Sequence, residues 1–270
     1  SEPMRMSVSV NNRGGNAKVY NIFKGSTGVE EIVGGNFSAG GLENIAPSEA
    51  ACDSNVNGFF PSAFAADLNR AFFIEIDTVT STANLVVYDS SVNSVIQVVS
   101  LPTELSVGSF VQSTAVYYHN GYVFVSSQSS GYRAIVAINA TNYSYNVTLV
   151  PGPDQLQYSD IDRQNNVLYI CSQGDYKIVK VDISNGSLVS LPLSYLDVSS
   201  YIQPLIPKVG DLYIAISDSG TNNIVLIDKT SFTYSSTVNV GTASIGMAFA
   251  GGQFVLAYFG ALAFLNESTL

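Results

Sequence analysis

The chain repeats one short pattern: an apolar run that closes on Asp or Asn and is followed by a polar turn. The clearest copy is NNIVLIDKTS at residues 222–231, and AKVYNIFKGS at 17–26 is a weaker one that closes on Lys24. The other copies are ANLVVYDSSV (83–92), RAIVAINATN (133–142), YKIVKVDISN (176–185) and GALAFLNEST (260–269). From Lys24 onward, the closing residues are 65, 50, 43, 46 and 38 residues apart. Such a period predicts a β-propeller, in which each repeat forms one four-stranded sheet, or blade.

Each period also contains further strand-like segments. Around Asn139 they are STAVYYH (113–119), YVFVSS (122–127) and NVTLV (146–150), and after Asp182 the outer strand is expected at SLVSL (187–191). The inner segments are apolar almost throughout, without strict alternation. This is typical of strands that are covered on both faces, as blades are by their neighbours.

The repeats predict an all-β fold with six visible four-stranded blades in a single domain, residues 1–270. The first blade is expected at about 5–36, with a strand at 5–10, an insertion at 37–58, and five further blades at about 59–270. The first blade would lack its first strand and the last its outer strand. A longer native chain would allow seven blades.

The residues that close the copies are expected to be turn formers, because short Asp and Asn side chains accept hydrogen bonds from nearby backbone N–H groups. We call them anchor residues. They are Asp89, Asn139, Asp182, Asp228 and Asn266, with Lys24 at the weaker copy.

Residues 212–252 resemble the YVTN-type β-propeller repeat of surface-layer and lactonase-like propellers. They keep Val240, Gly241, Gly246 and Ala248, but Ser244 stands where that repeat usually has proline. The resemblance implies a propeller fold and a cell-surface location. It transfers no catalytic residue, because the motif describes a blade and not an activity.

The composition of the chain disfavours some classes of binding partner. The net charge is −10 with only 11 Lys and Arg residues, which disfavours nucleic acid and anionic membrane surfaces. No apolar stretch is long enough to predict a membrane span. Asn-x-Ser/Thr tripeptides and a charge-poor composition favour an extracellular or cell-surface protein that carries glycans. The candidate glycosylation sites are Asn36, Asn139, Asn142, Asn146, Asn185 and Asn266.

Two cysteines leave two interpretations open. Cys52 and Cys171 match no metal or redox spacing, so they are either two free thiols or one possible disulfide.

Two carboxylate pairs are the candidates for chemistry. Glu75 and Asp77 share one face of a strand, and Asp160 and Asp162 share one face of a strand expected to line the axial channel. Such pairs hold Ca²⁺ or perform acid–base work, as in a lactonase-like hydrolase. Alternatively they cap turns or form ion pairs. His119 is the only histidine, so a transition-metal site is not expected.

The preferred hypothesis is a secreted or cell-surface, non-catalytic binding and assembly module, as in a surface layer, appendage or adhesin. It would bind proteins, or copies of itself, through loops or an unpaired strand edge, and it needs no cofactor. The alternatives are the hydrolase, with acids in the channel, and a spacer within a larger glycoprotein.

Overall fold

The structure is a computed structural model of an all-β chain. Its described residues are 17–24, 30–38, 41–44, 48–49, 56–65, 67–77, 82–89, 91–92, 94–102, 115–129, 132–151, 156–172, 175–187, 190–202, 204–218, 221–241, 246–258 and 261–270, with side chains described from residue 63 onward and some further gaps. Within this part of the chain, the one helical element is a single 3₁₀ turn at Glu267–Thr269. None of the described residues form a helix with the length and apolarity needed to cross a bilayer.

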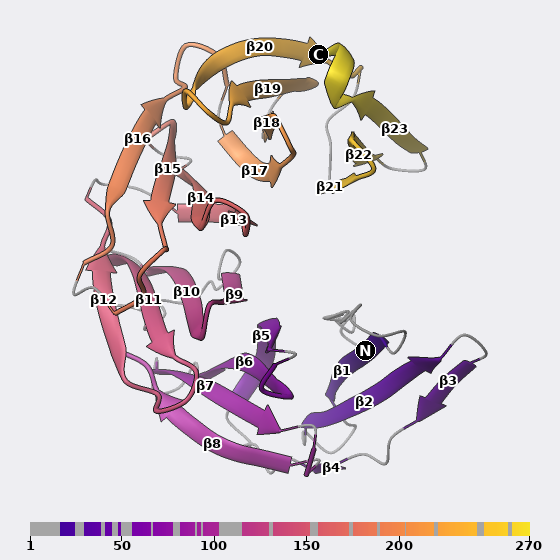
Figure 1. Cartoon of the computed structure of the whole chain (residues 1–270), viewed down its shortest axis with the longest axis vertical. Coiled ribbons are helices and arrows are strands. Elements are labelled where there is room, and N and C mark those ends of the chain that lie inside the picture. The colour runs from indigo at the N-terminus through magenta and orange to yellow at the C-terminus, as the bar shows by residue number, and fades with distance from the viewer. Residues whose placement is uncertain are drawn as a thin grey trace. The chain divides into compact units, whose positions relative to one another are not determined.

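The chain divides into two compact units, Ser1–Val147 and Thr148–Leu270. In the first unit, each of three sheets is antiparallel (Figure 1). The first sheet has the order β1-β2-β3, with β4 paired to β2. The strands are β1 (Ala17–Lys24), β2 (Glu30–Ser38), β3 (Gly41–Asn44), β4 (Ser48–Glu49), then β5 (Val56–Ala65), β6 (Arg70–Asp77), β7 (Thr82–Asp89) and β8 (Ser94–Ser100) in the second sheet, and β9 (Ala115–His119), β10 (Tyr122–Ser129), β11 (Tyr132–Asn139) and β12 (Tyr145–Leu149) in the third.

The second unit also contains three antiparallel sheets, two of four strands and a last one of three described strands (Figure 1). In each of them the strands pair in chain order. The strands are β13 (Leu156–Asp162), β14 (Val167–Ser172), β15 (Lys177–Asp182) and β16 (Leu193–Asp197) in the fourth sheet, β17 (Pro204–Val209), β18 (Tyr213–Asp218), β19 (Asn223–Asp228) and β20 (Thr233–Asn239) in the fifth, and β21 (Gly246–Ala250), β22 (Gln253–Tyr258) and β23 (Ala261–Asn266) in the sixth.

The second and third sheets of the first unit meet through their first strands, and so do the three sheets of the second unit. Strand β5 lies beside β9 in the first unit, and β17 lies beside both β13 and β21 in the second. Apolar side chains fill the space between the sheets: Tyr169 and Ile214 belong to the cluster between the fourth and fifth sheets, and Leu226 and Phe254 to the next. Every residue of β14 is buried, whereas outer strand β20 alternates exposed and half-buried positions. Burial on both faces therefore accounts for the weak alternation of the inner strands.

Three boundaries differ from the predicted ones or fall outside the described residues. The predicted insertion 37–58 contains β3 and β4, and the strand expected at 5–10 lies outside the described residues. The prediction of an outer strand at 187–191 is wrong, because the outer strand β16 begins only at Leu193. Asn185 Oδ1 accepts hydrogen bonds from both the N–H and the Oγ of Ser187 (3.1 and 2.6 Å), so residues 185–187 form a turn rather than a strand.

The turn-forming role of the anchor residues is confirmed wherever their side chains are described. In each case the Oδ1 atom accepts a backbone N–H two or three residues later, at 2.7 to 3.1 Å. The pairs are Asp89 with Ser91, Asn139 with Thr141, Asp182 with Ser184, Asp228 with Ser231, and Asn266 with Ser268. Both Asp and Asn serve, because the bond needs only the oxygen.

The residue after the anchor ties the end of the third strand to the first hairpin of the same sheet. Its N–H donates to a carbonyl of the turn between the first and second strands, at 2.9 to 3.0 Å. These bonds run from Ala140 to Gly121, Ile183 to Asn166, Lys229 to Leu212, and Glu267 to Gly252. In these four sheets, the first hairpin and the end of the third strand therefore lie at one end of the sheet.

This repeated turn leads to a first prediction. Asp182→Asn should leave the free energy of unfolding nearly unchanged, because the amide oxygen replaces the carboxylate oxygen as acceptor. Asp182→Ala should lower it by about 1 kcal/mol, the net value of one hydrogen bond. Urea denaturation of both variants measures the difference, and equal losses would contradict the role of the oxygen.

Candidate functional site

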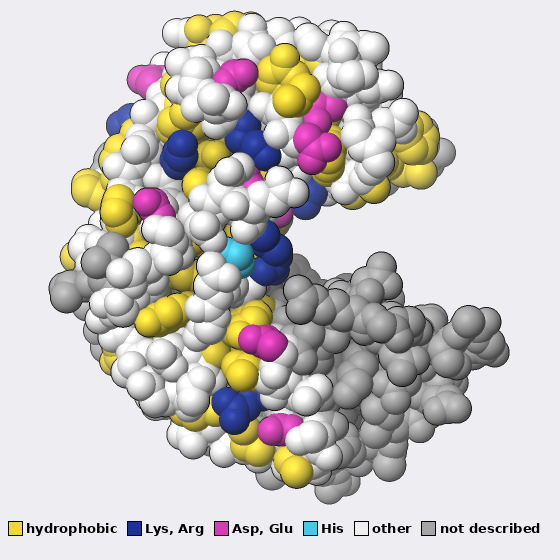
Figure 2. Space-filling view, in the orientation of Figure 1, with side chains coloured by type: hydrophobic (Ala, Val, Ile, Leu, Met, Phe, Trp, Pro, Cys, Tyr) yellow, Lys and Arg dark blue, Asp and Glu magenta, His cyan; other side chains and the backbone are white. Residues whose placement is uncertain are grey.

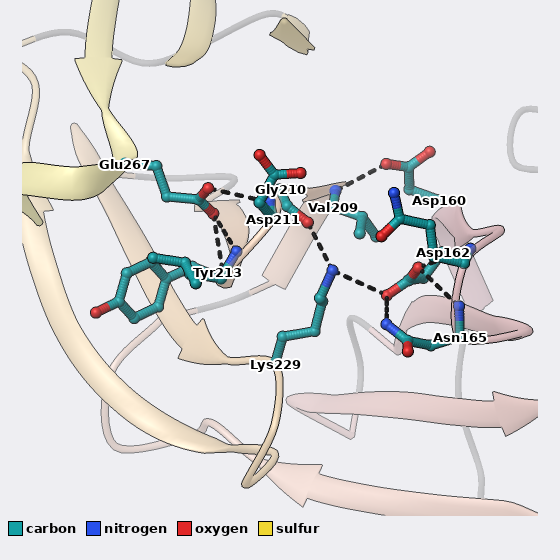
Figure 3. A network of polar contacts seen from close by, with 11 residues as sticks. Asp160, Asp162, Asn165, Val209, Gly210, Asp211, Tyr213, Lys229 and Glu267 are labelled. Carbon is teal, nitrogen blue, oxygen red and sulfur yellow. Dashed lines mark hydrogen bonds and ion pairs between the residues drawn. The ribbon is translucent and has the colours of Figure 1, made fainter. Parts of the chain in front are cut away.

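A network of charged side chains spans the three sheets of the second unit at the end where their first hairpins lie (Figure 3). It joins Asp160 and Asp162 of β13 to Lys208 of β17 and Lys229 after β19, and it includes Glu267 after β23. Each charged group comes from one sheet and contacts a neighbouring sheet.

Asp162 and Lys229 form the central ion pair. Lys229 Nζ lies 3.1 Å from Asp162 Oδ2, and the two side chains are only 11% and 3% exposed. The same Nζ donates to the carbonyl of Gly210 at 2.9 Å, within its own sheet. Lys229 thus links the fourth sheet to the first hairpin of the fifth.

Asp162 also caps its own turn. Its Oδ1 accepts the N–H groups of Gln164 and Asn165, both at 3.2 Å, and its Oδ2 accepts Asn165 Nδ2 at 2.8 Å. Burial raises the pKa of Asp162, but the hydrogen bonds from Asn165 and Lys229 outweigh it, so the net pKa is lowered. Nearby, burial and the charge of Asp162 raise the pKa of Tyr169 to about 12.

Asp160 makes a second, more open link between the same two sheets. Its Oδ2 lies 3.0 Å from Lys208 Nζ and accepts the N–H of Val209 at 2.8 Å. The Lys208 side chain is 27% exposed, so solvent screens this pair more than the one at Asp162.

Glu267 joins the sixth sheet to the fifth through backbone groups alone. Its carboxylate accepts the N–H groups of Asp211, Leu212 and Tyr213 at 3.0, 2.9 and 2.8 Å, and the residue is 4% exposed. Gly210 makes the approach possible: an added Cβ would collide with the Glu267 carboxylate and lie 2.6 Å from Phe254 Cζ. Three N–H donors satisfy a buried charge that has no cationic partner among these contacts.

In the first unit, the second and third sheets are also linked at the end where their first hairpins lie, but by an arginine and a tyrosine instead of lysines. Arg70 Nη1 donates to the carbonyl of Ala140 at 2.9 Å, and its Nε lies 4.0 Å from Asp89. Tyr118 donates its hydroxyl to Asp67 at 2.7 Å, and burial together with Asp67 raises the pKa of Tyr118 to about 12.

The structure thus brings two of the four predicted carboxylates together and gives each a lysine. Asp160 and Asp162 both face the fifth sheet. Glu75 and Asp77 lie on β6, but their side chains fall outside the described residues. Among the residues that are described, no group of three or more His, Cys, Asp or Glu side chains is placed to hold a metal ion.

The remaining predicted residues are placed as follows. His119 ends β9. Cys171 is a free thiol, and complete burial raises its pKa, whereas Cys52 lies outside the described residues. Sequence reasoning missed Lys208, Lys229 and Glu267. A signal existed for two of them, since Lys229 and Glu267 directly follow anchor residues where other copies have Ala140 and Ile183.

A second candidate surface lies on the sixth sheet. No described strand pairs with the outer side of β23, and its side chains Leu262 and Phe264 are 62% and 59% exposed. On the face shown in Figure 2, charged side chains are sparse among the described residues. Among the described residues, the edge therefore combines backbone groups that no strand pairs with and exposed apolar side chains.

Comparison with known proteins supports the fold alone. No protein-family model and no curated protein matches the chain. Among solved structures, it is similar to β-propeller-like proteins at 10–13% identity. These include a functionally unknown protein from Desulfotomaculum acetoxidans (12% identity, TM-score 0.63, 97% of this chain and 82% of that one), hydrazine synthase from Kuenenia stuttgartiensis (13%, 0.60, 83% and 71%) and a chain of a nidogen–laminin complex (10%, 0.52, 87% and 79%).

The central ion pair gives a second prediction. Asp162→Asn should lower the free energy of unfolding by about 3 kcal/mol, because it leaves Lys229 buried without its counter-charge. Chemical denaturation at neutral pH measures this loss. Asp197→Asn in the same sheet is the matched control, because Asp197 is exposed and its turn bond to Ser199 survives the change. A loss at Asp162 no larger than at Asp197 would refute the structural role.

The lowered pKa of Asp162 gives a third prediction. A carboxyl whose folded pKa lies below its unfolded value stabilises the fold above that unfolded value, 3.8 for a free Asp, and this stability is lost as the pH falls through the folded pKa. Lowering the pH from neutral to below the folded pKa of Asp162 should therefore reduce the free energy of unfolding of the wild type more than that of Asp162→Asn. Urea denaturation of both proteins at neutral and acid pH tests it, and parallel curves would contradict it.

Proposed function

We propose that the protein is a secreted or cell-surface, non-catalytic module that assembles with copies of itself through the outer edge of β23. The observation that carries the proposal is the exposure of Leu262 and Phe264 on a strand whose outer side no described strand covers. Edge strands of this kind add a strand from another chain, and backbone hydrogen bonds then extend the sheet.

The face of the sixth sheet that bears Leu262 and Phe264 is also apolar on the inner strands β22 and β21. Leu262 and Phe264 pair with Ala257 and Val255 of β22, and Val255 pairs in turn with Ala248 of β21. The opposite face, which includes Phe254 and Leu256, packs against the fifth sheet. Elsewhere in this unit, apolar sheet faces are buried against a neighbouring sheet. An exposed face of the same character favours burial against another copy of the chain.

The fold neighbours are compatible with this proposal without deciding it. One of them is a chain of a nidogen–laminin complex, which is an assembly of proteins, while another is named hydrazine synthase. We further propose that the sheets are blades of a YVTN-type propeller, six in number or seven with a longer chain, in one domain. Surface-layer, appendage or adhesin components fit such a module.

The competing hydrolase needs free carboxylates to act as acid, base or Ca²⁺ ligands. Asp160 and Asp162 instead pair with Lys208 and Lys229 and accept backbone or amide hydrogens. These contacts support a structural role for both. Lactone hydrolysis that is abolished in Asp160→Asn would favour the enzyme.

Self-assembly gives a fourth prediction. Sedimentation velocity of the wild type should show association that increases with concentration. The double variant Leu262→Ser and Phe264→Ser should sediment as a monomer, because the apolar contribution of the edge is lost. Val92→Ser is the control, since Val92 is equally exposed (62%) but lies in a turn. A monomeric wild type, or association that persists in the double variant, would contradict the proposal.

A further inference from the structure

We propose that, of the five candidate asparagines whose side chains the structure describes, Asn142, Asn185 and Asn266 are the N-glycosylation sites of the folded chain. The inference rests on the proposed secreted location, because glycosyl transfer occurs outside the cytoplasm. What selects these three is the local geometry of each Asn-x-Ser tripeptide.

In each of the three, the asparagine is exposed. Its Oδ1 accepts two hydrogen bonds from the serine two residues later, one from the backbone N–H and one from the hydroxyl. The Ser N–H lies 3.0 to 3.1 Å from Oδ1 and the Ser Oγ lies 2.6 to 2.8 Å from it. The serines are Ser144 for Asn142, Ser187 for Asn185, and Ser268 for Asn266. Both bonds engage the amide oxygen, so the amide nitrogen Nδ2, the atom that is modified, is left outside the turn.

Asn139 and Asn146 are placed differently. Asn139 is the half-buried last residue of β11, and its Oδ1 accepts only the backbone N–H groups of Thr141 and Asn142. Asn146 is half-buried within β12, where the sheet restricts access. The side chain of Asn36 lies outside the described residues.

The chemistry requires only an activated donor, a lipid-phosphate-linked oligosaccharide. Nδ2 attacks the anomeric carbon of the first sugar, forming the N–C bond, while the bond from that carbon to the phosphate oxygen breaks. The lipid phosphate leaves with the electron pair, and one proton leaves Nδ2 to a base of the transferring enzyme. The serine hydroxyl on Oδ1 polarises the amide and holds it in the orientation that exposes Nδ2.

The three sites share a place in the fold. Asn142 and Asn185 follow the third strand of their sheets and Asn266 is the last residue of its third strand, in each case at the end where that strand meets the first hairpin. Sugars would therefore stand at this end of the third, fourth and sixth sheets. The outer side of β23 would stay open along most of its length, with a glycan only at Asn266, its last residue.

The test uses the purified, folded full-length chain, a single-subunit oligosaccharyltransferase and a lipid-linked oligosaccharide, with peptide mass spectrometry to measure the occupancy of each site. Folded protein should be modified at Asn142, Asn185 and Asn266 about fivefold more than at Asn139 and Asn146, the ratio that corresponds to one net hydrogen bond of preorganisation. Urea-unfolded chain should lose this preference. Equal occupancy of all five sites in the folded chain, or no modification at the three, would overturn the proposal.

Two variants at one site test the need for the hydroxyl that bonds to the asparagine Oδ1. Ser187→Thr keeps the hydroxyl and should keep Asn185 modified, whereas Ser187→Ala should abolish modification there and leave Asn142 and Asn266 unchanged. Because the donor and enzyme are supplied in vitro, this result does not depend on where the protein resides. A native protein recovered from the cytoplasm would contradict the proposed location, while the site preference would still stand.

Discussion

The ion pair between Asp162 and Lys229 is the contact on which the second unit depends. Lys229 leaves the third strand of one sheet, reaches a buried carboxylate of the preceding sheet, and holds the Gly210 carbonyl of its own first hairpin. A buried charge that loses its partner is costly, so the two sheets must keep the relative position that brings Lys229 to Asp162. Apolar packing between sheets is non-directional and does not by itself fix how one sheet sits on the next.

The repeat explains why the links occur where they do. The anchor residue turns the chain, and the next N–H binds the first hairpin. In the fifth and sixth sheets, the side chain of that next residue reaches the neighbouring sheet. In two sheets the residue is apolar, Ala140 or Ile183; in the next two it is Lys229 and Glu267. The backbone pattern is constant, and the chemistry of each junction varies with one side chain.

The sequence predicted much of the fold because each strand run and turn is local. It missed β17, whose Pro204 and Pro207 argue against a strand; Pro204 is its first residue, and the pairing shifts register between the two prolines. The partners of Asp160 and Asp162 were beyond prediction for a different reason. Lys208 and Lys229 lie dozens of residues away, and only the packing of two sheets brings them together.

A double-mutant cycle on Asp162 and Lys229 tests this account most directly. The single variants Asp162→Asn and Lys229→Met and the double variant should be unfolded with denaturant at neutral pH. We expect the double variant to be clearly more stable than the sum of the single losses implies, with a coupling of about 2 kcal/mol, because neither charge is then left alone. Losses that simply add would show that the pair does not hold the sheets together.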